Sequence, residues 1–211
     1  MKTSELVELL AHDGTRSAAP GSTLLRALLP AGMLSAALLV LLIGIRADVG
    51  DAFQTPRFNL KLLLNAALWI SATGLLLRLA RPVDRPGLWT KAMWLVPVAL
   101  LMAVLIELFL LPRDQWWPVA HGRNSTWCLR IIPALSIAPL AASLWALRRA
   151  APARPALAGA AAGLMCAGLA GTLYAMHCPD DSPLFVAIWY VLATALVTLA
   201  GALLGARLLR W

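Results

Sequence analysis

Long apolar runs alternate with short polar segments along almost the whole chain. Each run holds the ~20 residues that an α-helix needs to cross ~30 Å of hydrocarbon. The runs cover approximately residues 24–45, 60–79, 92–111, 128–148, 156–176 and 184–204. None shows the polar and apolar alternation of a membrane β-barrel, and helices satisfy their own backbone polar groups in lipid. The pattern therefore predicts an all-α integral membrane protein, a bundle of six transmembrane helices.

The first 22 residues are more polar than the runs that follow. An apolar stripe typical of a short amphipathic helix is formed by Leu6, Val7, Leu9 and Leu10. The polar positions around this stripe are mainly acidic, and anionic lipid would repel them. The membrane surface and a cytoplasmic protein both remain as candidate partners for the stripe. We expect a cytoplasmic N-terminal segment over residues 1–22 and a six-helix transmembrane domain over residues 23–211.

Composition and charge support this picture and orient it. Hydrophobic residues make up 61% of the chain and charged residues 13%, whereas soluble domains hold about a quarter charged residues. The net charge of +8 comes from basic clusters at the ends of the apolar runs, so it indicates orientation in a bilayer and no direct contact with nucleic acid. With a cytoplasmic N-terminus, twelve of the 18 Lys and Arg residues lie on the inner side. Both termini are therefore predicted to be cytoplasmic.

A short polar island separates the fifth and sixth runs. It reads His177-Cys178-Pro179-Asp180-Asp181-Ser182-Pro183. A second cysteine, Cys128, begins the fourth run, and the predicted topology puts both thiols near the outer face, where an oxidising compartment allows a disulfide to persist. The candidate sensing residues are Cys128, Cys178, His177, Asp180 and Asp181, and His121 could lie nearby.

The chemistry of these cysteines has three interpretations. Cys128 and Cys178 can form a disulfide or redox-sensing pair if their Cα atoms come within roughly 7 Å. Their thiolates can instead hold a soft metal ion together with His177, although no local ligand spacing supports such a site. Otherwise they are unrelated cysteines that behave as small hydrophobes. Cys166 lies in the middle of the fifth run, where burial keeps a thiol inert, and we interpret it as a packing residue.

Three further features concern the helices and their connections. Small residues at helical spacing in the fifth run, which permit close helix contact, are Gly159, Gly163, Gly168 and Gly171. Glu107 and Arg130 are expected near outer helix ends, where snorkelling or a mutual ion pair would stabilise them. The tryptophan-rich segment 112–127 is predicted to be a loop.

Catalytic signatures are missing from the sequence. It contains no HExxH, GxSxG, Walker or GxGxxG motif, and no CxxC pair. The spans supply neither internal repeats nor a polar site at the membrane midplane, which argues against a small-molecule transporter. We therefore expect no enzyme activity and no cofactor.

Several segments together resemble one family. They are Met1-Lys2-Thr3 with the stripe that follows, Trp127-Cys128, Arg154-Pro155-Ala156, the His177–Pro183 island, and Arg207-Leu208-Leu209-Arg210-Trp211. These residues resemble the NrsF family of bacterial inner-membrane anti-sigma factors, the negative regulators of sigma F. The resemblance covers the whole chain, and the seven-residue island is its most specific part.

The resemblance implies a function and a location. A short cytoplasmic N-terminal segment would hold an extracytoplasmic-function sigma factor at the bacterial inner membrane, and Cys128 and Cys178 would face the periplasm. We predict a multi-pass anti-sigma factor that releases its partner on an envelope redox or heavy-metal signal. The alternative is a membrane thiol oxidoreductase that passes electrons from the outer cysteines to a quinone, although the second thiol pair expected of such an enzyme is missing.

Overall fold

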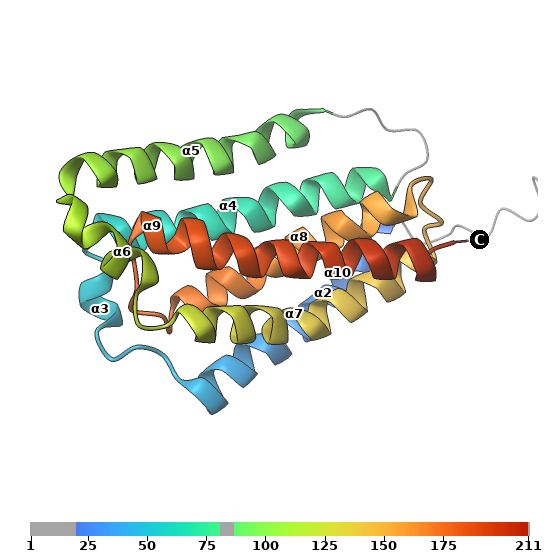
Figure 1. Cartoon of the computed structure of the whole chain (residues 1–211). Coiled ribbons are helices and arrows are strands. Elements are labelled where there is room, and N and C mark those ends of the chain that lie inside the picture. The colour runs from blue at the N-terminus through green and yellow to red at the C-terminus, as the bar shows by residue number, and fades with distance from the viewer. Residues whose placement is uncertain (1–19, 81–86, 211) are drawn as a thin grey trace, which may run out of the picture.

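The computed structural model describes residues 20–80 and 87–210, which form helices joined by short connections (Figure 1). Within these residues there is no β-strand, which confirms the predicted all-α class. Six helical segments of this part of the chain are long and apolar enough to cross a membrane, as predicted. They are Gly21–Ile43, Pro56–Leu79, Leu88–Leu110, Arg113–Arg148, Pro155–Ala175 and Pro183–Leu208.

Some of these segments are made of several helical elements. The elements are α2 (Pro20–Leu38), η1 (Leu39–Ile43), α3 (Val49–Ala52), α4 (Pro56–Leu79), α5 (Leu88–Leu110), α6 (Arg113–His121), α7 (Ser125–Arg148), α8 (Pro155–Ala175), α9 (Pro183–Phe185), η2 (Val186–Tyr190) and α10 (Val191–Leu208). The π-helical turn η1 extends α2, and η2 joins α9 to α10 in one continuous segment.

Two helices begin where the sequence supplies a hydroxyl cap followed by proline. The Oγ1 atom of Thr55 accepts a hydrogen bond from the backbone N–H of Phe58 at the start of α4. Ser182 does the same for the N–H of Leu184 at the start of α9. Each cap satisfies an N–H that the helix itself leaves unpaired, and the proline that follows is already set for helical geometry.

The tryptophan-rich segment differs from the prediction, because it contains helix α6 instead of being entirely loop. Asp114 in the first turn and His121 in the last turn complement the helix dipole. The indole N–H of Trp189 in η2 also donates to the carbonyl oxygen of Ala120 at 2.9 Å. A nine-residue helix is too short for its periodicity to stand out in the sequence.

Helix α8 lies at the centre of the bundle and packs against α10 on one side and α4 on the other. A Cβ atom on Gly159 would overlap the carbonyl oxygen of Gly201 in α10, and one on Gly168 would lie 2.6 Å from the backbone nitrogen of Trp69 in α4. The predicted close contact through the glycines of this helix is therefore confirmed.

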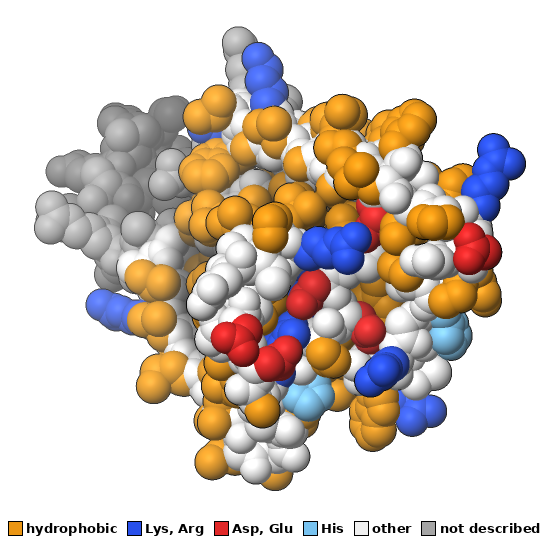
Figure 2. All heavy atoms as spheres, turned by 90° about the vertical axis from the view of Figure 1, so that its left-hand side faces the viewer, with side chains coloured by type: hydrophobic (Ala, Val, Ile, Leu, Met, Phe, Trp, Pro, Cys, Tyr) orange, Lys and Arg blue, Asp and Glu red, His pale blue; other side chains and the backbone are white. Residues whose placement is uncertain are grey.

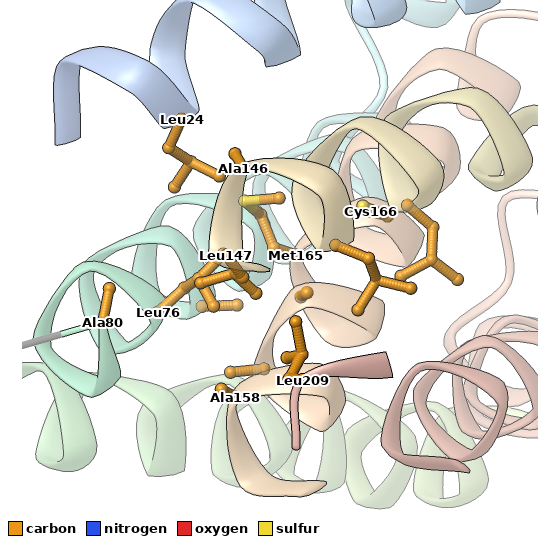
Figure 3. Packing of buried hydrophobic residues seen from close by; sticks show 14 of the residues in the cluster. Leu24, Leu76, Ala80, Ala146, Leu147, Ala158, Met165, Cys166 and Leu209 are labelled. Atoms are coloured by element: carbon orange, nitrogen blue, oxygen red, sulfur yellow. The ribbon is translucent and has the colours of Figure 1, made fainter. Parts of the chain in front are cut away.

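Two apolar clusters fill the bundle. One contains Leu24 of α2, Ala80 after α4 and Leu209 after α10, so both described ends of the chain lie at the same end of the bundle (Figure 3). Cys166 is fully buried in this cluster, with its Sγ atom 3.6 Å from the Oγ atom of Ser143. The other cluster, toward the opposite end, contains Cys128 and both tyrosines of the chain.

Helix α5 stands apart from the other long helices (Figure 1). It contacts α4, α9 and η2, and Glu107 is its one buried residue. At its other end the indole ring of Trp89 lies against Gly74 of α4, where no Cβ atom would fit.

Candidate functional site

The two cysteines that the sequence singled out meet at the end of the bundle that carries α3 and α6. Cys128 lies in the first turn of α7, and Cys178 lies in the connection between α8 and α9. Both side chains are fully buried in one cluster with Tyr174 and Tyr190. The two residues are free thiols, and the Sγ atom of Cys178 lies 3.9 Å from the carbonyl oxygen of Asp180. The fold thus brings together two thiols that lie fifty residues apart in the sequence.

A buried lysine holds the backbone of the polar island. The ammonium group of Lys61, on the second turn of α4, donates to the carbonyl oxygen of Cys178 at 2.7 Å and to that of Asp180 at 3.3 Å. It also forms an ion pair with the carboxylate of Asp181. The Lys61 side chain is fully buried, so its charge depends on these partners for stabilisation.

Arg46, in the connection after η1, is the second cation that holds the island. Its guanidinium contacts Asp181 at 2.8 Å and forms two parallel hydrogen bonds with the carboxylate of Asp48, at 2.8 and 2.7 Å. These bonds lower the pKa of Asp48 to about 2 and raise the pKa of Arg46. Asp181 therefore lies between two cations, one from α4 and one from the connection after η1.

Asp180 connects the island to the start of α7. Its Oδ2 atom accepts hydrogen bonds from the backbone N–H groups of Arg123 at 3.0 Å and Asn124 at 2.8 Å. Asn124 is the N-cap residue of α7, and its carbonyl oxygen accepts the N–H of Cys128 at 2.9 Å. The segment that carries Cys178 is thus tied to the helical turn that carries Cys128.

The nearby glycine allows this close approach. Gly122, between α6 and α7, has a φ of 60°, which favours glycine. A Cβ atom at this position would also lie 2.5 Å from the ring of Phe185 and 2.8 Å from the carboxyl carbon of Asp180.

The histidines have other partners. The Nδ1 atom of His177 lies 3.0 Å from the carbonyl oxygen of Gly44, and its ring faces Tyr174. His121 lies between the rings of Trp117 and Trp189. Among the described residues, no group of three or more His, Cys, Asp or Glu side chains is arranged to hold a metal ion.

Glu107 ties α5 to the island. Its Oε2 atom accepts hydrogen bonds from the hydroxyl of Ser182 at 2.6 Å and from the N–H of Leu184 at 3.0 Å. Its Oε1 atom pairs with the guanidinium of Arg57 at 3.0 Å. Of the two alternatives for Glu107 and Arg130, the mutual ion pair is therefore wrong, because Glu107 pairs with Arg57 and Arg130 is an exposed residue of α7.

Charged side chains of both signs gather at this end of the molecule (Figure 2). Every acidic residue of the described chain lies here, namely Asp48, Asp51, Glu107, Asp114, Asp180 and Asp181. The hydrogen bond from the Cys128 thiol and the positive charge of Lys61 lower the pKa of Cys178. A pair of adjacent thiols in which one is favoured as the thiolate can be oxidised to a disulfide or can capture a thiophilic ion.

Sequence reasoning identified the cysteines and aspartates but missed the residues that hold them. Lys61, Arg46 and the Glu107 contacts to Ser182 and Leu184 were not predicted as parts of one site. One signal was available, since Lys61 lies inside the second apolar run and an ionisable residue within a span is a candidate functional residue by default. The predicted partner-binding stripe, formed by Leu6, Val7, Leu9 and Leu10, lies outside the described residues.

Comparisons with a protein-family model and with curated proteins point to one family. Residues 10–211 match the family described as NrsF, negative regulator of sigma F. The chain is 34% identical over its full length to the full-length anti-sigma-F factor NrsF of Caulobacter vibrioides. It is also 34% identical, again over all of both chains, to the probable anti-sigma-F factor NrsF of Azospira oryzae. No solved structure matches the chain.

Proposed function

The chain belongs to the NrsF family of negative regulators of sigma F, and we propose that it is an anti-sigma factor of the bacterial inner membrane. Six helices cross the bilayer, with both termini in the cytoplasm. The N-terminal segment 1–22 holds an extracytoplasmic-function sigma factor through the stripe from Leu6 to Leu10. The names of the two relatives and the excess of Lys and Arg on the inner side support this assignment.

The signal acts at the pair formed by Cys128 and Cys178. The observation that carries this proposal is that two free thiols, one from α7 and one from the island, are fully buried in the same cluster. An envelope oxidant that takes up two electrons joins the sulfur atoms and releases two protons. A thiophilic heavy-metal ion instead displaces the protons and bridges the thiolates.

Either reaction changes the distance between segments that other contacts already restrain. Asp180 ties the island to Asn124 of α7, Lys61 ties it to α4, and Ser182 ties it to Glu107 of α5. A shift of the island is therefore passed to three helices, which continue to the opposite end of the bundle. There the change in helix packing alters how the N-terminal segment is presented and releases the sigma factor.

A reporter driven by a promoter that depends on the sigma factor tests the proposal. Cys128→Ser and Cys178→Ser should give the same loss of induction by a thiophilic metal, and the double variant should be no worse than either one. Cys166→Ser is the matched control, because this third buried thiol lies in the other cluster, and it should respond as wild type. Full induction of the double variant would exclude a sensing role for the pair.

The same assay tests capture of the partner. Changing Leu6 and Leu10 together to Asp should raise reporter activity without any signal, because charged residues cannot serve as apolar anchors in a groove. The amount of protein in the membrane fraction should not change, since the spans are untouched. Repression equal to wild type would contradict the role assigned to this segment. Membership of a family of regulators favours the anti-sigma role over the alternative, a membrane thiol oxidoreductase. A quinone bound to the purified protein would instead support the oxidoreductase.

A further inference from the structure

A groove of about 780 Å³ runs between α7 and α10. Its walls are apolar, with Ile137 and Leu144 on α7 and Leu204 on α10. Small side chains on both helices, Ala141 on α7 and Ala200 on α10, also line the groove and leave space in it. The volume falls within the range of about 300–1,000 Å³ that is typical of small-molecule sites.

The length of the groove matches a bilayer. It extends along α7 from Arg130 to Arg148. Arg148 follows Arg130 by 18 positions, which at 1.5 Å per residue corresponds to about 27 Å, close to the ~30 Å of the hydrocarbon core. One leaflet is about half of that thickness, ~15 Å, so an acyl chain that starts at the Arg148 end would fill about half of the groove.

Among the residues that the structure describes, the charged side chains at the Arg148 end are all basic. The guanidinium of the adjacent Arg149 lies 4.4 Å from the ring centre of Trp145, which also lines the groove. The acidic residues of the described chain all lie at the other end of the bundle, and within that part of the chain neither arginine forms an ion pair. Two guanidinium groups beside an apolar groove complement a phosphate, which arginine binds with paired hydrogen bonds.

We propose that this groove binds an anionic phospholipid, with an acyl chain along α7 and α10 and the phosphate at Arg148 and Arg149. Basic pockets between transmembrane helices on the cytoplasmic side are suited to anionic headgroups. A second copy of the chain fits less well, because a symmetric contact through this groove would bring the same arginines of both copies together. The proposal rests on placement of the helices in a membrane and is independent of the sigma factor.

Binding of phosphatidylglycerol to the purified full-length chain in detergent, measured by native mass spectrometry, tests the proposal. Arg148→Gln combined with Arg149→Gln should weaken binding roughly thirtyfold, since each arginine near an anionic headgroup contributes about fivefold. The matched control is Arg154→Gln combined with Arg210→Gln, which removes the same charge from exposed positions outside the groove and should leave affinity unchanged. Ala200→Phe should also weaken binding, because it fills the groove and leaves the charge intact.

Three results would overturn the proposal. Equal weakening in both double variants would mean that phosphatidylglycerol responds only to the overall charge of this end. Equal affinity for phosphatidylglycerol and phosphatidylcholine would exclude recognition of an anionic headgroup. A dimer that Ala200→Phe dissociates would identify a second copy as the occupant. None of these measurements includes a sigma factor. The lipid proposal can therefore be overturned while the reporter results support the anti-sigma role, and the anti-sigma role can be overturned while lipid binding is confirmed.

Discussion

At the scale of single residues, Lys61 connects α4 to the segment that carries Cys178. Its ammonium contacts the carbonyl oxygens of Cys178 and Asp180 and the carboxylate of Asp181. All of these partners belong to the island, while Lys61 itself belongs to α4. Removing the charge leaves two carbonyl oxygens without this donor and leaves Asp181 with Arg46 as its remaining cation.

Lys61→Met should therefore lower the free energy of unfolding by about 3–5 kcal/mol, the usual cost of removing one partner of a buried ion pair. Lys91→Met is the matched control, because Lys91 is exposed on α5, and it should change stability by less than about 0.5 kcal/mol. Reversible unfolding in mixed micelles gives both values. Equal stability of the two variants would show that Lys61 is not needed to hold the island.

The lowered pKa of Cys178 gives a pH-dependent prediction. Because the pKa is lower in the folded state than in the unfolded chain, the thiolate stabilises the fold above the unfolded pKa, and this stabilisation is lost as the pH falls through the folded pKa. The thiolate absorbance of the folded protein across pH, taken as the difference from Cys178→Ser, should have its midpoint below that of an ordinary cysteine. Cys128→Ala removes the hydrogen bond that contributes most and should move the midpoint to higher pH. A midpoint that does not move would exclude this cause.

At the scale of elements, the contact between α8 and α10 determines how closely the bundle packs. Gly163 of α8 lies against the backbone of Val197 and Thr198 of α10, so the approach is limited by main-chain atoms that cannot move aside like a flexible side chain. Small residues are used in this way when lipid provides no hydrophobic driving force between helices.

Gly163→Ala should destabilise the bundle by about 1–3 kcal/mol, because the added methyl group would meet backbone atoms. Gly32→Ala in α2 is the control: its Cβ atom would lie 3.5 Å from a methyl group of Leu169, an ordinary contact, so stability should stay within about 1 kcal/mol of wild type. Unfolding in mixed micelles distinguishes the two. A larger loss at Gly32 would contradict the packing described for α8.

The helices were predictable from the sequence to a greater extent than the site. A run of ~20 apolar residues specifies a spanning helix by length alone, and the glycines of α8 marked a close contact. Two of the three partners of Lys61 could not be predicted, because they are backbone carbonyl oxygens more than a hundred positions away, and their role does not depend on the type of side chain. Helix α6 was missed because a segment of nine residues is too short for a helical period to be recognised in the sequence.

At the scale of the whole molecule, the described acidic residues all lie at the end that carries the cysteines, whereas Arg148, Arg149 and the described chain ends lie at the other. This asymmetry agrees with an orientation in which the second end is cytoplasmic. If all six segments cross the membrane, both termini lie on the same side, because the number of spans is even.

A reporter enzyme that is active only in the periplasm tests this orientation. Fused after Ser182, in the island, it should be active. Fused after Arg154, in the connection between α7 and α8, it should be silent. The opposite pattern would place the cysteines in the reducing cytosol, where a disulfide would not persist, and would remove the basis for envelope sensing.

The contacts of Glu107 also constrain the order in which the protein is assembled during synthesis. Ser182 follows Glu107 by 75 residues, so at about 5–20 residues per second the ribosome makes it roughly four to fifteen seconds later. During that interval the carboxylate on the nascent chain lacks its final hydrogen-bond donors. Arg57, which pairs with Glu107 in the finished fold, precedes it in the chain and is therefore synthesised first. Of the partners that Glu107 has in the finished fold, Arg57 is therefore the one that is already synthesised when Glu107 is made, and Ser182 and Leu184 are added later.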